Sequence, residues 1–287
     1  MGPSRTELMR ISESVGEPSG WDFARVRWDR DPTPWQYDDV VRRYLARESD
    51  VLDIGTGGGE VFLGMAVHFG SGIGVDRDPG MIQVADGNRH AQGIRHVSFA
   101  TMDARELRFP DNTFDVVLNR HCFVDASEIS RVLTRGGVFV TQQVARRNTL
   151  NILEAFGWTP ESFGEGWWQP IAGLASSFRD LGCRIEAQAE YDVSYWFRDV
   201  PSLVFWLKAV PLPEPFDPAK HWEAVRAIIA QYSTDRGIQT SEHRELLVAR
   251  KPWSSLGSAL QQAELSPRIR RNRHTRGPFE ALPKKDP

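Results

Sequence analysis

Three aspartates in the first half of the chain stand where a strand would meet a ligand. Asp53, Asp76 and Asp103 each lie in or just after a short apolar run. The first run leads into the stretch 55–59, which reads Gly-Thr-Gly-Gly-Gly. Glycine has no Cβ and accepts dihedral angles that other residues resist, so a ligand can approach this backbone closely. We therefore expect a nucleotide-like ligand at the carboxyl end of a parallel sheet.

The residue that follows the glycines narrows the class of ligand. A dinucleotide fingerprint that starts at Gly55 requires glycine at position 60, where this sequence has Glu60. The carboxylate of Glu60 would also repel a pyrophosphate. No Gly-Lys-Ser/Thr sequence of a phosphate-binding loop follows. Acidic residues on both sides of the glycines, Asp53 and Glu60, suit a ligand that has a positive group and no phosphate.

Apolar runs typical of buried strands alternate with helical patterns, which indicates an α/β domain with a mostly parallel sheet. The expected strands are 51–54, 72–75, 97–100, 114–118, 138–144, 184–191 and 245–250. The expected helices are 38–47, 61–69, 81–90 and 126–133. Two later stretches, 145–170 and 195–222, are rich in tryptophan and show no clean strand period.

The composition is that of a globular chain. The 287 residues are 40% hydrophobic and 25% charged, which excludes a collagen, a coiled coil and a wholly disordered chain. No apolar run approaches the ~18 to 20 residues of a membrane helix, and the N-terminus lacks the apolar core of a signal peptide, so we expect a cytoplasmic protein. The two cysteines argue against a disulfide framework or a structural zinc site, and we expect no metal.

Three regions are expected along the chain. Residues 1–34 form an N-terminal extension, and 35–252 form the main domain. This domain carries aromatic-rich insertions near 145–170 and 195–240, which are expected to build an acceptor pocket or lid. Residues 253–287 are rich in Lys and Arg and poor in large apolar side chains, so they are expected to be a disordered tail. A phosphate-seeking arm and a solubilising terminus both fit this tail.

Several of these segments resemble the class I S-adenosylmethionine-dependent methyltransferases. VLDIGTGGGE at 51–60 resembles the first motif of that family, GVDRD at 74–78 its second, and Met-Asp-Ala at 102–104 its third. The resemblance is close over 35–145 and loose from there to about 252. It implies S-adenosyl-L-methionine as the cofactor. It also implies a Rossmann-like three-layer sandwich, with a mostly parallel seven-stranded sheet whose last strand is antiparallel.

The resemblance also implies roles for single residues. Asp53 would face the methionine end of the cofactor, Asp76 would accept hydrogen bonds from both ribose hydroxyls, and Asp103 would take the adenine amino group. The expected cofactor-binding residues are Asp53, Gly55, Thr56, Gly57, Gly59, Asp76, Arg77, Asp103, Ala104, Asn119, Trp35 and Tyr37. Taken singly, each of the three aspartates also fits an ordinary turn or cap position.

Methyl transfer from a sulfonium is an in-line displacement, so the protein mainly has to align donor and acceptor and exclude water. A base matters only when the nucleophile must lose a proton early. His121, just after the fourth expected strand, is the candidate catalytic base, and a packed structural histidine is the alternative. Arg120 could hold the cofactor carboxylate or an acidic acceptor, or cap a helix. Cys122 as a methyl carrier would need a cationic setting.

Aromatic and amide side chains complete the expected site. Trp35 and Tyr37 could contact the sulfonium by cation–π attraction or simply fasten the first helix to the sheet. Gln142 and Gln143 end the fifth strand, and one side chain of the pair should point to each face. The tryptophans of the later stretches are expected to line a pocket for a flat or apolar acceptor: Trp158, Trp167, Trp168, Trp196 and Trp206.

These observations predict a methyltransferase that modifies an oxygen or nitrogen atom of a small molecule. The alternatives are an RNA methyltransferase that uses the basic tail and a non-catalytic regulatory protein that binds S-adenosylmethionine. The sequence lacks the Asn/Asp-Pro-Pro-aromatic motif of enzymes that methylate amino groups of nucleic-acid bases, so nucleic acid is disfavoured as a partner. Glu60 argues against a nicotinamide-dependent oxidoreductase.

Overall fold

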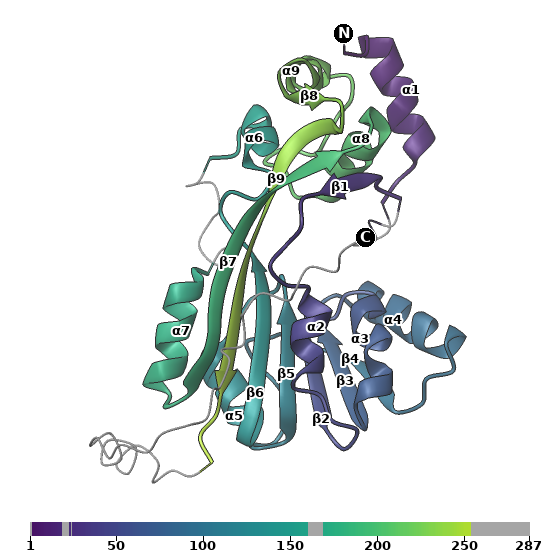
Figure 1. Ribbon diagram of the computed structural model, residues 1–287. Coiled ribbons are helices and arrows are strands. Elements are labelled where there is room, and N and C mark those ends of the chain that lie inside the picture. Colours follow the sequence, from purple (N-terminus) through teal and green to yellow (C-terminus); the bar gives the residue numbers. More distant parts are fainter. Residues whose placement is uncertain (1, 19–22, 24, 160–168, 254–287) are drawn as a thin grey trace, which may run out of the picture.

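The computed structural model describes residues 2–18, 23, 25–159 and 169–253, which are built around a nine-stranded sheet (Figure 1). The strands are β1 (Trp28–Arg30), β2 (Asp50–Ile54), β3 (Ser71–Asp76), β4 (Val97–Thr101), β5 (Phe114–Arg120), β6 (Leu133–Val144), β7 (Arg184–Phe197), β8 (Ser233–Thr234) and β9 (Gly237–Arg250). The α-helices are α1 (Arg5–Val15), α2 (Tyr37–Arg42), α3 (Glu60–Gly64), α4 (Pro79–Ala91), α5 (Ala126–Val132), α6 (Leu150–Leu153), α7 (Ile171–Asp180), α8 (Val200–Ala209) and α9 (Trp222–Tyr232). The 3₁₀ turns are η1 (Ala66–His68) and η2 (Glu154–Phe156).

Seven of the strands follow the order β4-β3-β2-β5-β6-β9-β7. Parallel pairing joins β4 to β3, β3 to β2, β2 to β5 and β5 to β6. β9 lies between β6 and β7 and is antiparallel to both. This arrangement confirms the Rossmann-like fold with a mostly parallel sheet and an antiparallel last strand. The short strands β1 and β8 add antiparallel pairs to β7 and β9.

The sheet separates two hydrophobic cores, because successive residues of a strand point to opposite faces. Val51 of β2 belongs to the core that α2 and α3 cover, and its neighbour Leu52 belongs to the core that α5 and α7 cover. Both residues are fully buried. Burial on both faces explains why the parallel strands read as unbroken apolar runs. Helix, sheet and helix therefore form the three predicted layers.

β7 and β9 continue well past the parallel strands. β6 pairs with β9 only over 244–250, whereas β7 pairs with β9 as far as Ile238. The free ends of the two strands rise from the sheet as a two-stranded ribbon, with β1 along its edge (Figure 1). The predicted strands 184–191 and 245–250 were therefore correct in place but too short.

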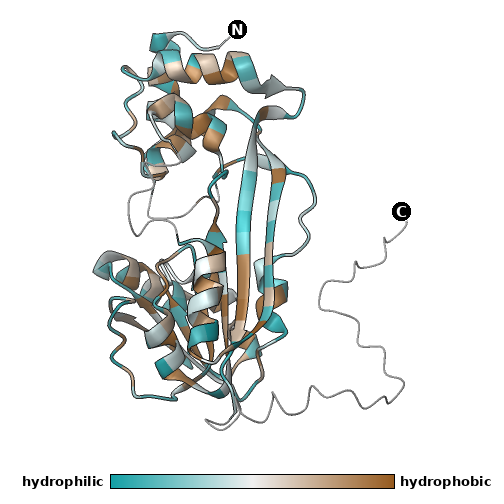
Figure 2. Ribbon diagram, turned by 90° about the vertical axis from the view of Figure 1, so that its left-hand side faces the viewer, coloured by the Kyte–Doolittle hydropathy of each residue, from teal (hydrophilic) through white to brown (hydrophobic). Residues whose placement is uncertain are grey.

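The ribbon carries a second body, here called the upper lobe, made of α1, β1, α6, α8, α9, β8 and the ends of β7 and β9 (Figures 1 and 2). Its core includes Leu8 from α1, Phe197 from β7, Leu203 from α8 and Ile228 from α9, all buried. The stretch 195–222, which shows no clean strand period in the sequence, is not irregular: it contains the end of β7 and α8, and its aromatic and aliphatic residues contribute to this third core.

Side-chain caps mark the first residues of two helices in the upper lobe. The Asp199 side chain accepts a hydrogen bond from the Ser202 amide at the start of α8. At the other end of the chain, Ser4 and Glu7 form a capping box that starts α1. In the described ranges, no helix combines the length and apolar character needed to cross a membrane. The predicted tail lies almost entirely outside the described residues.

Candidate functional site

The glycine-rich loop follows β2 and turns into α3. The amides of Gly55 and Thr56 donate to the carbonyl of Val75 in β3, at 2.8 and 3.0 Å. Gly55, Gly57 and Gly59 have positive φ angles of 74°, 55° and 76°, a region that favours glycine. A Cβ at Gly55 would lie 2.4 Å from the Cβ of Cys122, whereas a Cβ at Gly57 would meet no atom within 4 Å. The loop is therefore packed against protein at Gly55 and open at Gly57.

Asp76, at the end of β3, connects this loop to the next one. One carboxylate oxygen accepts from the Gly57 amide at 3.0 Å, and the other accepts from the Asp78 amide at 3.0 Å. The cap of α4 is Asp78, whose side chain accepts from the Gly80 amide. Asp76 is therefore not the cap of this helix, and it remains partly exposed next to the glycine loop. The next residue, Arg77, is exposed.

Asp53 is buried in the floor of the loop. Burial is the main cause that raises the pKa of its carboxyl to about 6, and the neighbouring charge of Asp76 raises it further. Thr56 and the guanidinium of Arg120 act in the opposite direction. The Thr56 hydroxyl oxygen is itself buried next to this carboxyl. A buried carboxyl and a buried hydroxyl therefore lie at the same loop.

Asp103 lies at the end of the adjoining strand β4. The amide of Met102 donates to the carbonyl of Asp76 at 2.9 Å, which holds the two strand ends together. The Asp103 side chain accepts from the Arg105 amide at 2.8 Å and is 48% exposed. Ala104 follows it and is partly buried. The carboxylates of β2, β3 and β4 thus stand in a row along one edge of the sheet.

The N-terminal segment before α2 crosses the ends of β5 and β6. The Trp35 indole donates to the Gln142 side chain at 3.0 Å, and the Tyr37 hydroxyl donates to the Asn119 carbonyl at 3.4 Å. Both aromatic side chains are buried. Trp35 also contacts Tyr191 edge to face, with ring centroids 4.6 Å apart. These contacts fasten the segment to the sheet, which is the second of the two roles considered for these residues.

Asn119 is completely buried at the end of β5. Its side-chain oxygen accepts from Thr141 at 3.1 Å and from Gln143 at 2.7 Å, and its amide donates to the Phe123 carbonyl. The side chain is thus engaged with the protein, so direct contact with a cofactor stays a prediction. Gln143 points toward Asn119 and Gln142 toward Trp35, in opposite directions as expected.

His121 follows β5 in a left-handed conformation, with φ of 59°, and its amide donates to the Gln142 carbonyl at 3.0 Å. His121 is exposed to solvent. Desolvation by the protein, together with the charges of Arg244 and Arg120, lowers the pKa of His121 well below its ordinary value. The imidazole is therefore neutral near pH 7. Burial raises the pKa of the Cys122 thiol to about 11, so Cys122 is not a thiolate.

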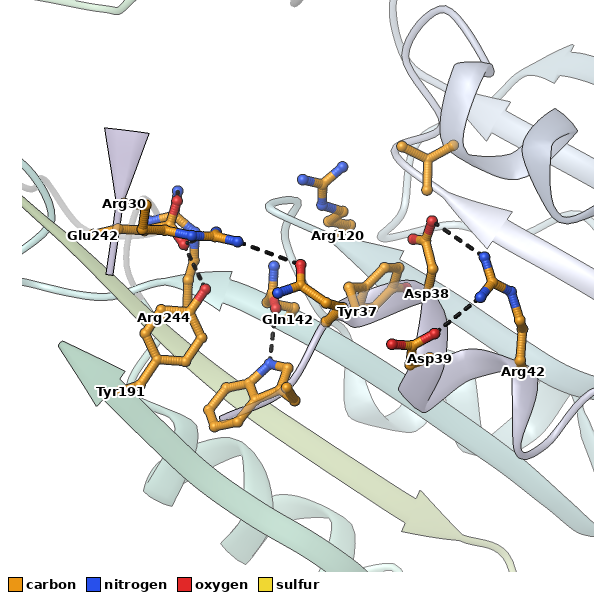
Figure 3. A pocket seen from close by; sticks show the side chains of 13 residues that line it. Arg30, Tyr37, Asp38, Asp39, Arg42, Arg120, Gln142, Tyr191, Glu242 and Arg244 are labelled. Atoms are coloured by element: carbon orange, nitrogen blue, oxygen red, sulfur yellow. Dashed lines mark hydrogen bonds and ion pairs between the residues drawn. The ribbon is translucent and has the colours of Figure 1, made fainter. Parts of the chain in front are cut away.

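A cavity of about 450 Å³ lies between α2, the ends of β5 and β6, and the middle of β7 and β9 (Figure 3). Most of its walls are polar or charged. The lining residues are Arg30, Trp35, Gln36, Tyr37, Asp38, Asp39, Arg42, Val61, Arg120, Gln142, Tyr191, Glu242 and Arg244.

The expected aromatic acceptor pocket differs from this cavity. Among the tryptophans that the structure describes, only Trp35 is one of the lining residues. Trp196 is buried under the Arg236 guanidinium, Trp206 packs on Phe197, and Trp158 donates to the Pro211 carbonyl. Trp167 and Trp168 lie outside the described residues. Sequence reasoning missed Glu242 and Arg244, whose alternation in a longer β9 places both on the same face.

Comparisons with known proteins agree with this geometry. Residues 51–137 match the family model described as a methyltransferase domain. The uncharacterized methyltransferase YcgJ of Bacillus subtilis is 36% identical over 100 residues, 32% of this chain and 40% of that protein. Ajmaline N-methyltransferase of Rauvolfia serpentina is 36% identical over 180 residues, 55% of this chain and 59% of that protein. Aklanonic acid methyltransferase DauC of a Streptomyces species is 33% identical over 114 residues, 36% of this chain and 52% of that protein. The chain spans about half the length of these relatives.

Solved structures show the same fold at low identity. The crystal structure of YcgJ from Bacillus subtilis gives a TM-score of 0.56 at 18% identity and covers 75% of this chain and 98% of that one. A methyltransferase-like protein from Bacillus halodurans, BH2331, gives a TM-score of 0.54 at 18% identity. The match covers 76% of this chain and 99% of that one.

The sheet order and the glycine loop at the end of β2 define a Rossmann-like protein with a nucleotide-type site. The sequence match over 51–137 makes the assignment more specific. Residues 51–137 match a methyltransferase domain, and the fold around them is the Rossmann-like fold of the class I S-adenosylmethionine-dependent methyltransferases.

The two glycines with different surroundings give a matched pair of variants. Gly55→Ala should cost about 3 kcal/mol or more, because a left-handed φ and a clash with Cys122 combine. Gly57→Ala should cost only about 1 to 2 kcal/mol, since its Cβ meets no neighbour. Urea unfolding measures both. Equal losses in the two variants would show that the packing at Gly55 is wrong.

Asp53→Asn should stabilise the free protein at neutral pH. The pKa of Asp53 is raised in the fold, so its favourable contribution is present at low pH and is lost as the pH rises through about 6. Asn cannot ionise, so the variant should be more stable by about 2 to 3 kcal/mol at pH 7.5 and should lose that advantage near pH 4. Urea unfolding at the two pH values tests this. A variant less stable than the parent at pH 7.5 contradicts it.

Proposed function

We propose that this chain is a methyltransferase that moves the methyl group of S-adenosyl-L-methionine to an oxygen or nitrogen atom of a small molecule. One observation carries the proposal. The glycine loop is held beside three carboxylates, and Val61 of the helix that follows the loop lines a cavity of about 450 Å³. Donor and acceptor can then be aligned in one place, which is the main requirement of an in-line displacement.

The residues around the loop fit this cofactor. S-adenosylmethionine supplies a methyl group already activated by a positively charged sulfur. Asp76 would hold the ribose hydroxyls, since a carboxylate is an acceptor without donors. Asp103 and Ala104 would hold the adenine at the end of β4, and Thr56 offers a buried hydroxyl in the glycine loop. Asp53 would face the cationic end, where a positive charge favours its ionised form.

The cavity supports a small acceptor. Its volume of about 450 Å³ lies in the range typical of sites for small ligands. Ajmaline N-methyltransferase and aklanonic acid methyltransferase, two of the relatives, are named for small-molecule acceptors. His121 is neutral near pH 7 and so has a free nitrogen lone pair that could accept a proton from the acceptor. A hydroxyl or protonated amine would require that step.

Calorimetry with the purified chain tests the cofactor assignment. We expect S-adenosylmethionine and S-adenosylhomocysteine to bind, and NAD not to bind. Asp76→Asn should weaken binding by about 1.5 to 3 kcal/mol, because one ribose contact loses its charge-assisted acceptor. Asp78→Asn is the matched control, since Asn also caps helices well and should leave affinity nearly unchanged.

Turnover separates an enzyme from a binding protein. Isotope-labelled donor, incubated with the chain and extracts of its source organism, should label a small molecule that can then be identified. Label in RNA would instead support the nucleic-acid alternative. Binding of both cofactor forms without any labelled product would favour a regulatory protein. Binding of NAD in place of S-adenosylmethionine would refute the proposal.

A further inference from the structure

Three arginines and one glutamate line one side of the cavity. Arg30 donates to Glu242 at 2.6 Å, and Arg244 lies 3.7 Å from the other oxygen of the same carboxylate. Tyr191 also donates to Glu242, at 2.5 Å. The three side chains of Arg30, Glu242 and Arg244 are 19%, 13% and 15% exposed. Two guanidinium groups therefore share one carboxylate in a mostly buried setting.

Arg120 adds a third positive charge. It ends β5 and lines the same cavity, with its guanidinium 5.9 Å from the centre of the Tyr37 ring. Arg120 forms no hydrogen bond or ion pair with any described residue. Figure 3 shows it between the Glu242 group and α2, without a dashed line to either. A guanidinium has five donors and always carries its charge.

The remaining charged residues of the cavity form a second, separate group. Arg42 bonds to Asp39 at 2.9 Å and lies 3.9 Å from Asp38, all within α2 (Figure 3). That group has one more negative than positive charge. The group of Arg30, Arg120, Arg244 and Glu242 has two more positive than negative charges. Burial is the main cause that lowers the pKa of Arg244, Glu242 and Tyr191 act in the opposite direction, and the nearby charges of Arg120 and Arg30 lower it further.

We propose that the acceptor carries an anionic group, such as a carboxylate, which binds Arg120 on the side of the cavity that faces Arg244. This inference rests on the proposed function and names the chemical class of its acceptor. An anion there would balance the excess positive charge and accept from the Arg120 guanidinium, which has no hydrogen-bond partner among the described residues. The other anion available to a methyltransferase is the carboxylate of the donor. The acceptor is favoured because neither the glycine loop nor Asp76 or Asp103 lines this cavity.

The experiment uses benzoate as a minimal anionic probe and benzamide as its neutral counterpart. The full chain is first saturated with S-adenosylhomocysteine, so that the donor site is filled, and each probe is titrated by ligand-observed NMR. We expect benzoate to bind with a dissociation constant of about 1 mM and benzamide to bind at least about tenfold more weakly. Arg120→Gln should weaken benzoate binding about tenfold or more, because a charge-assisted contact is lost.

Two further variants control for general effects of charge. Arg42→Gln removes a cavity arginine that already has carboxylate partners, and it should change benzoate affinity by less than about twofold at physiological salt. Glu242→Gln removes the one carboxylate in the cationic group and should tighten benzoate binding by several fold. Thermal unfolding confirms that each variant is folded before it is titrated.

The outcomes separate the inference from the proposed function. Equal binding of benzoate and benzamide, or no binding of either, overturns the anionic acceptor. Arg120→Gln that weakens S-adenosylhomocysteine but not 5′-methylthioadenosine, which lacks the amino-acid part, assigns Arg120 to the donor carboxylate and also overturns it. Failure of the unmodified chain to bind S-adenosylhomocysteine at all counts against the proposed function itself.

Discussion

The hydrogen bond between the Gly57 amide and Asp76 is the contact on which the site depends. It joins the loop after β2 to the loop after β3, and the second oxygen of the same carboxylate fixes the turn into α4. Parallel pairing alone brings the strand ends to one edge of the sheet, but it does not fix the loops that follow them. With both oxygens of Asp76 engaged, the open backbone at Gly57 and the buried carboxyl of Asp53 keep a constant geometry.

Charge is distributed unevenly around this fixed centre. Toward β4 the site presents carboxylates, and burial brings the pKa of one of them, Asp53, to about 6. Toward β9 it presents guanidinium groups with too few carboxylates to neutralise them. Arg120 lies between the two regions and influences both, because its charge lowers the pKa of Asp53 and of His121. A ligand that carries positive charge on one side and negative charge on the other is complementary to this field.

The parallel half of the fold could be predicted from sequence because each of its features is local. Unbroken apolar runs mark strands buried on both faces, and the glycines after Ile54 mark the turn beneath the ligand. The cavity could not be predicted, because it depends on pairs of residues far apart in the chain, such as Arg30 with Glu242 and Trp35 with Gln142.

The upper lobe was missed for a different reason. The run Tyr195-Trp196-Phe197 and the cap at Asp199 are local signals, but the surrounding prolines and tryptophans favoured an irregular interpretation.

β7 and β9 serve the upper lobe and the cavity with the same backbone. Tyr191, Glu242 and Arg244 stand where the paired strands leave the sheet, while farther along the same strands Phe197 and Ile238 are fixed in the core of the lobe. The ribbon therefore connects the upper lobe directly to one wall of the cavity. Glu242 lies on the ribbon and Arg120 lies on the sheet, so a tilt of the upper lobe against the sheet would change the distance between these two side chains. The positive potential in the cavity would then depend on the position of the upper lobe, although the lobe contributes few of the lining residues.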